Sequence, residues 1–202
     1  MSFELKVFKE KECLPYVDLV VEMRLNAFSA FPYLYVATFE EERSYVSELS
    51  STPQGLLVVV FNEDQVIGFF SGIPLNLPNS HLEPYVKKLQ EKGVDTNTTY
   101  YGGEIIVIPE FQKGRCCALL IKRFLQEVKS MGFRQLLFVT CIREENHPLC
   151  PKNYTSPESV WLKSGAQKTD IVLSIPWRTH QAKRAPKRQM NSLACWIKPL
   201  SF

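Results

Sequence analysis

The chain of 202 residues lacks several features that would assign it to a specialised class of protein. It has no apolar run near the roughly 20 residues that span a membrane. Its start is rich in charged side chains, which is not the pattern of a secretory signal. The net charge of +3 is too small to indicate nucleic acid by itself, so we expect no nucleic-acid or membrane partner. No internal repeat is present, and we expect a single domain over residues 1–202.

The six cysteines include no C-x-x-C pair. Cys141, His147 and Cys150 carry donor atoms for a metal, but a fourth ligand and a recognised spacing are missing. We therefore expect no metal site, and we expect reduced thiols in a cytoplasmic protein.

The remaining sequence alternates between apolar strands and amphipathic helices, which predicts an α/β fold with partly antiparallel strands. Strands are expected at 3–7, 56–61, 66–73, 105–108, 135–140, 168–176 and 193–197, and helices at 15–30, 38–50, 84–92, 116–131 and 157–164. Segment 74–99 is longer than a connection requires, and it is either a surface insertion or one wall of a binding site. Segment 178–188 is read as a basic loop exposed to solvent, with contact to an acidic partner as the alternative.

The most informative stretch runs from Tyr100 to Phe133. An apolar strand passes through Pro109 into a short polar loop, and an amphipathic helix follows and is closed by Gly132. A helix that begins just after such a strand and loop presents unpaired backbone N–H groups and the positive end of its dipole, which together suit a phosphate group.

This segment resembles the phosphate loop of the GNAT family of acyl-CoA-dependent N-acetyltransferases. Gln112 matches the Arg or Gln that opens the family's loop. Either Arg115 and Cys117 then replace the family's small residues in register, or one residue is lost and Gly114 takes the glycine position. Further matches follow in the family's order, and they are Phe31–Tyr35, Thr38–Glu42, Gly68-Phe69, Gly103-Glu104, His147-Pro148 and Trp161–Gly165.

The resemblance implies a mixed, mostly antiparallel central sheet of about seven strands flanked by helices, with the fourth and fifth strands splayed apart. It also implies acetyl-CoA as the acyl donor, an amine acceptor that is a small molecule or a peptide, and a homodimer as one assembly. The cofactor would contact a set of residues along the strand and the loop, namely Ile106, Val107, Ile108, Gln112, Lys113, Gly114, Arg115, Cys116 and Cys117.

The reaction needs a base, because an alkyl amine with a pKa of about 10.4 is almost fully protonated at neutral pH. Glu104 is the candidate base, with a raised pKa expected from the neighbouring aromatic residues. The alternative is a glutamate at the edge of the strand that is either salt-bridged or solvated. Arg24 has two candidate roles, which are binding a carboxylate of the acceptor and pairing with solvent-exposed charges near Glu22.

Tyr154 and His147 are the candidate acids for the departing thiolate, because Trp161 stands where the family often has a tyrosine. Either residue could instead be structural. Phe31, Tyr33 and Tyr35 are expected at the acceptor wall. We therefore predict an N-acetyltransferase that works by direct attack in a ternary complex, and the alternative is a GNAT-fold protein that binds CoA or another ligand without turnover.

Overall fold

The computed structural model describes residues 3–77, 82–112, 115–144, 146–181 and 184–200. Its helices and strands follow one another in a mixed α/β order. They are β1 (Phe3–Lys9), η1 (Glu10–Tyr16), α1 (Val17–Ser29), β2 (Tyr35–Val36), α2 (Phe39–Ser51), β3 (Leu56–Asn62), β4 (Gln65–Pro74), α3 (Glu83–Glu91), β5 (Thr99–Val107), η2 (Pro109–Phe111), α4 (Cys116–Ser130), β6 (Gln135–Cys141), α5 (Glu158–Lys163), β7 (Gln167–Gln181) and β8 (Arg184–Pro199).

A central sheet of eight strands holds the fold together, in the order β1-β3-β4-β5-β6-β8-β7-β2. All neighbours in it are antiparallel except β5 and β6, which are parallel. The mixed, mostly antiparallel sheet is therefore confirmed. The eighth strand is β2, where the sequence analysis expects no strand, and it pairs with β7 over two residues.

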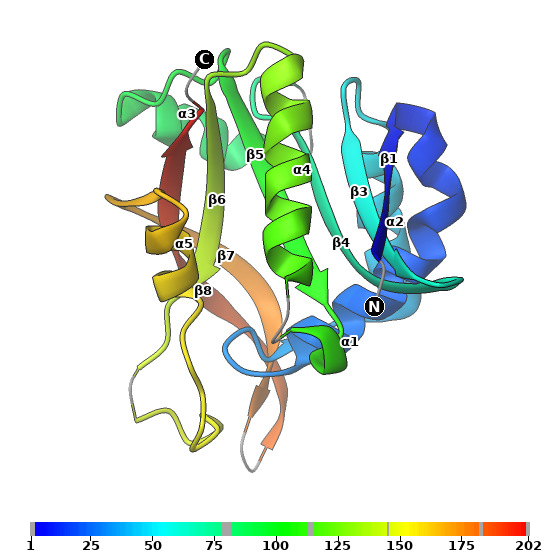
Figure 1. Cartoon of the computed structure of the whole chain (residues 1–202). Helices are drawn as coiled ribbons and strands as arrows, with labels where there is room; N and C mark the ends of the chain where they lie inside the picture. The colour runs from blue at the N-terminus through cyan, green and yellow to red at the C-terminus, as the bar shows by residue number, and fades with distance from the viewer. Residues whose placement is uncertain (1–2, 78–81, 113–114, 145, 182–183, 201–202) are drawn as a thin grey trace.

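The two faces of the sheet are covered by different helices (Figure 1). Alternate residues of β3 point to opposite faces. Val58 and Val60 pack with Phe124 of α4, whereas Leu57 and Val59 pack with the core residues of α1 and α2. The helix 116–131 was predicted from its apolar stripe, and Leu120, Phe124 and Val128 of that stripe are buried.

Local sequence signals placed several elements correctly. The predicted helix 38–50 begins with a capping box of Thr38 and Glu41, in which each side chain accepts a hydrogen bond from the other residue's backbone N–H. Gly132 follows α4 with φ of 92°, a conformation that glycine adopts readily. The first helix differs from the prediction, because 3₁₀ helix η1 contains Pro15 and α1 begins only at Val17.

Three of the strands are much longer than predicted. Strand β5 begins at Thr99, so Glu104 lies within the strand and not near its start. Strands β7 and β8 form a long hairpin that includes the described part of segment 178–188, so the expected basic loop is wrong. In Figure 1 this hairpin extends beyond the body of the sheet.

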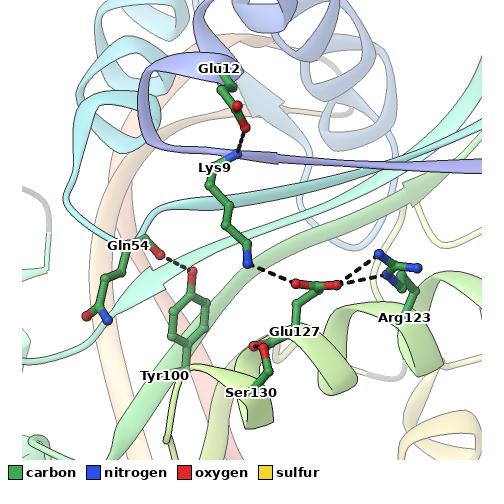
Figure 2. Close-up of polar contacts among 7 residues, drawn as sticks. All are labelled: Lys9, Glu12, Gln54, Tyr100, Arg123, Glu127 and Ser130. Carbon is green, nitrogen blue, oxygen red and sulfur yellow. Dashed lines mark hydrogen bonds and ion pairs between the residues drawn. The ribbon is translucent and has the colours of Figure 1, made fainter.

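Polar contacts tie the first strand to the face that α4 covers (Figure 2). Lys9 Nζ at the end of β1 lies 3.0 Å from Glu127 Oε2 of α4. Arg123 binds the other carboxylate oxygen of Glu127 one turn earlier. Beneath them the buried Tyr100 hydroxyl lies 2.8 Å from the carbonyl oxygen of Gln54. No described helix is long and apolar enough to cross a membrane.

Candidate active site

Strands β5 and β6 separate soon after they begin. They pair only from Thr99 to Tyr101 on β5 and from Gln135 to Leu137 on β6. Beyond Tyr101 the side of β5 that faces β6 has no strand partner, whereas its other side stays paired with β4 as far as Val107. A backbone edge is therefore open in the middle of the sheet.

The register decides which residues of β5 direct their backbone groups toward this open edge. The Ile108 N–H donates to the Ile67 carbonyl on the β4 side at 2.9 Å. Because hydrogen-bonded and non-bonded pairs alternate in an antiparallel ladder, Ile106 also faces β4, and Ile105 and Val107 face the open edge. Of the three expected cofactor residues on this strand, only Val107 thus presents its backbone there.

The loop after β5 closes back on that edge. The Gln112 side chain donates from Nε2 to the Val107 carbonyl at 2.8 Å. Helix α4 then begins at Cys116 with Arg115 at its N-cap, and its first turn contains no acidic residue. The N–H groups at its start have no partner within the helix, so this end favours an anion. Lys113 and Gly114, which were predicted to contact the cofactor, lie outside the described residues.

The two cysteines at the start of α4 lack the features of a catalytic nucleophile. Cys116 is fully buried, and burial raises the pKa of its thiol to about 11. Burial also raises the pKa of the Cys117 thiol. A thiol is nucleophilic only after it loses its proton, so both side chains act as small apolar groups at neutral pH.

Strand β5 contains a β-bulge close to the point where it separates from β6. Ser71 pairs with Glu104 and Gly72 pairs with Gly102, so Gly103 is the extra residue on β5. Directly after the bulge, Glu104 is only 8% exposed. Its Oε1 atom accepts a hydrogen bond from Ser71 Oγ at 2.7 Å, and its Oε2 atom forms an ion pair with Arg24 Nη1.

Arg24 joins Glu104 to a second buried carboxylate. Its Nε atom lies 2.7 Å from Glu42 Oε2 of α2, and the Tyr35 hydroxyl donates to the other oxygen of Glu42 at 2.6 Å. The guanidinium lies over the Tyr45 ring, 4.6 Å from its centroid. Burial alone would lower the pKa of Arg24, but the nearby negative charges, Glu104 first among them, raise it well above its usual value.

These groups line an open cavity of about 580 Å³ on the side of the sheet that carries α1 and α2. A cavity of this size suits a small-molecule ligand. Its wall is largely aromatic and includes Phe28, Tyr33, Tyr35, Tyr45, Tyr85, Tyr101 and Trp177. Tyr33 and Tyr35 were expected at such a wall. Phe31 was expected too, but it is not among the lining residues.

Phe31 instead packs against the loop after β6. Its ring lies 4.7 Å from the Tyr154 ring and 5.7 Å from the His147 ring. Arg143 holds this loop to the same segment by donating to the carbonyls of Pro32 and Tyr33. The two predicted acids, His147 and Tyr154, therefore both pack against Phe31, and neither lines the cavity.

The predicted acids also have structural roles. The His147 Nδ1 atom accepts the Leu149 N–H at 3.2 Å and so stabilises a turn. Burial raises the pKa of the Tyr154 hydroxyl, which keeps its proton in place. Trp161 packs against Phe138 in the core and takes no place at the cavity.

Comparison with solved structures identifies the fold. The yncA protein of Salmonella typhimurium, solved with its cofactor acetyl-CoA, is 13% identical, with 100% of this chain and 95% of that chain covered and a TM-score of 0.56. An acetyltransferase of the GNAT family from Streptococcus pneumoniae is 11% identical over 97% and 99% of the two chains, with a TM-score of 0.55. An aminoglycoside 6′-N-acetyltransferase complexed with coenzyme A is 13% identical over 100% and 98%, with a TM-score of 0.60. This chain has the GNAT acetyltransferase fold. No protein-family model and no curated protein matches its sequence.

The sequence analysis did not predict which residues contact Glu104. Arg24, Glu42 and Ser71 come from α1, α2 and β4, and no spacing in the sequence links them. The capping box of Thr38 and Glu41 marks the start of α2. Glu42 lies one residue further along, on the same helix face as the buried Val46 and Leu49. Among the described residues, no cluster of His, Cys, Asp and Glu side chains could hold a metal ion.

Proposed function

We propose that this chain is an N-acetyltransferase of the cytoplasm, which moves the acetyl group of acetyl-CoA to an amine. The proposal rests on the open edge of β5, which runs from the bulge at Gly103 toward the start of α4. One end of this edge leads to the N-terminus of α4, and the other end meets the cavity that contains the buried carboxylate of Glu104. The attack is direct, without a covalent enzyme intermediate, in keeping with the protonated thiols of Cys116 and Cys117.

The donor would bind along the open edge. Its pantetheine arm carries amide groups that can pair with the backbone of Ile105 and Val107 as an added strand does. Its pyrophosphate would lie at the N-terminus of α4, where N–H groups and Arg115 favour negative charge. Gln112 already donates to the Val107 carbonyl, so the arm would pair with Val107 mainly through its N–H group.

The amine would enter the cavity and approach Glu104. Ser71 and Arg24 occupy one lone-pair site on each carboxylate oxygen, and a carboxylate offers about four such sites in all. Glu104 therefore retains capacity to accept a proton from the amine, directly or through water. Gly103 beside it also lines the cavity, and an N–H group on the open edge of β5 would stabilise the oxyanion.

The thiolate that leaves needs a proton or a positive dipole. Tyr154 and His147 remain the proposed acids, and both would have to act from the loop that packs on Phe31. Tyr33 and Tyr101 line the cavity and carry hydroxyl groups, and burial raises the pKa of each. Phenylalanine variants of Tyr154, Tyr33 and Tyr101, and the variant His147→Gln, each remove one candidate proton donor, and they distinguish these four residues by their effect on kcat.

The test of the base compares two carboxylates that share Arg24. Glu104→Gln should lower kcat about 10²- to 10⁴-fold while acetyl-CoA still binds, because general-base catalysis contributes that much. Glu42→Gln is the matched control, since it also removes one buried negative charge beside Arg24. Equal losses in the two variants would contradict the role of Glu104 as the base, and would leave both residues structural.

A second function is a GNAT-fold protein that binds CoA or another ligand without turnover. Two contacts favour it. The Val107 carbonyl, which an incoming pantetheine amide would need, is already bound by Gln112, and Trp161 is packed in the core where the family often has a tyrosine. Mass spectrometry decides between the two functions, because binding of acetyl-CoA without any acetylated product across a broad amine panel supports the second.

A further inference from the structure

The buried end of the cavity carries an excess negative charge. Arg24 is a single cation between two carboxylates, and the side chains of Arg24, Glu42 and Glu104 are only 8%, 3% and 4% exposed. The Ser71 and Tyr35 hydroxyls donate hydrogen bonds to these carboxylates, but they add no charge. A cationic group that enters the cavity would therefore be attracted toward this end.

The rim of the cavity carries an excess positive charge. Arg178 and Arg188 face each other directly across β7 and β8, so their side chains leave the hairpin on the same face. Arg178 is balanced by Glu41 and also donates to the Val36 carbonyl. Arg188 lines the cavity and is exposed, and among the described residues it has no hydrogen-bond or ion-pair partner.

Between the two ends the wall is aromatic and fixed in place. Trp177 donates from Nε1 to the Tyr33 carbonyl at 3.2 Å, and its ring meets the Tyr35 ring edge to face. Strand β2 holds Tyr35 and Val36 against β7. A ligand that lies along these rings would meet the negative cluster at one end and Arg188 at the other.

We propose that the acceptor is an amine that also carries an anionic group, a carboxylate or a phosphate, with its ammonium toward Glu42 and Glu104 and its anion at Arg188. That this amine is an acetyl acceptor rests on the proposed function, whereas its binding in the cavity does not depend on acetyl transfer. Polyamines fit poorly, because their second cation would meet Arg178 and Arg188. Amines whose carboxylate or phosphate lies several bonds from the nitrogen match the cavity at both ends.

The experiment titrates the full chain with three ligands that share one skeleton, namely tyramine, tyrosine and tyramine O-phosphate, by calorimetry without acetyl-CoA. Tyramine O-phosphate, whose anion lies far from the ammonium, should bind up to about fivefold more tightly than tyramine, the effect of one partly exposed ion pair. Tyrosine, whose carboxylate lies next to the ammonium, should gain less, because its two charges cannot reach the two ends of the cavity together. The preference should vanish in Arg188→Gln.

Lys187→Gln is the control, because Lys187 is an exposed cation on the same strand whose side chain points to the opposite face. It should keep the preference. The proposal is overturned if tyramine or tyrosine binds as tightly as tyramine O-phosphate, if none of the three binds, or if the two variants lose the preference equally.

The outcomes also separate this proposal from the acetyltransferase itself. An anion preference that depends on Arg188, with no acetylated product when acetyl-CoA is added, leaves the ligand class standing and removes the activity. If tyramine is acetylated and no preference for an anionic ligand is found, the acetyltransferase activity stands and the proposed ligand class is removed.

Discussion

Replacing Arg24 with methionine tests the electrostatic centre of the candidate site. The substitution keeps an unbranched apolar side chain beside the rings of Phe28 and Tyr45, and it removes the cation between Glu42 and Glu104. Two carboxylates whose side chains are 3% and 4% exposed would then lie near each other without a positive partner.

The expected loss of stability is large. Removing one partner of a buried ion pair costs about 3–5 kcal/mol, because the remaining charge stays buried and unpaired. A domain of ordinary stability, about 5–15 kcal/mol, survives such a loss. With a urea m-value of about 2 kcal/mol/M, the midpoint of unfolding falls by about 2 M. The triple variant Arg24→Met, Glu42→Gln, Glu104→Gln should recover part of the loss, because it buries no charge.

Urea unfolding followed by tryptophan fluorescence measures these differences. Arg123→Met is the matched control, because Arg123 is 43% exposed on its side chain and pairs with Glu127 on the surface of α4. That variant should lose less than about 1 kcal/mol. If Arg24→Met lost no more than Arg123→Met, or if the triple variant were less stable still, the buried charge cluster would not be the feature that the geometry indicates.

Three further substitutions test the strands around the site. Tyr100→Phe should cost about 1–3 kcal/mol in urea unfolding, because the buried hydroxyl lies 2.8 and 2.9 Å from two backbone carbonyls, and no loss would contradict this. Gly72→Ala should cost about 1–3 kcal/mol or more, because its Cβ would lie 2.9 Å from two aromatic rings and closer still to a strand carbonyl, whereas a Cβ on Gly103 has no atom nearer than 3.5 Å. Equal thermal midpoints for the two alanine variants would refute that packing. Val107→Pro should weaken acetyl-CoA binding about fivefold by removing an N–H from the open edge, whereas Ile106→Pro should mainly destabilise the β4–β5 ladder, and unchanged binding by Val107→Pro would refute the pairing.

Local patterns were sufficient to predict much of the fold. The apolar stripe of α4, the capping box of α2 and the polar turn between β3 and β4 each depend on residues close together in the chain. The helix N-terminus after β5 was predicted in the same way. The GNAT resemblance then supplied the mixed, mostly antiparallel sheet with its splayed fourth and fifth strands, which local patterns do not contain.

The parts that failed have no signature in the sequence. Segment 178–188 is too polar and basic to resemble a strand, yet its described residues pair with one another across the hairpin, as Arg178 does with Arg188. The two-residue strand β2 exists only through β7. The partners of Glu104 come from α1 and β4, so the cluster that holds it is formed by the fold and has no signature in the sequence.

A calorimetric titration with acetyl-CoA, with CoA and ADP as comparison ligands, tests the central claim most directly. The account predicts acetyl-CoA binding with a Kd on the order of micromolar and clearly weaker binding of ADP, because ADP has the pyrophosphate for α4 but no pantetheine arm to pair with β5. No detectable binding of acetyl-CoA, or equal affinity for ADP, would contradict the assignment of the open edge of β5 as the donor site.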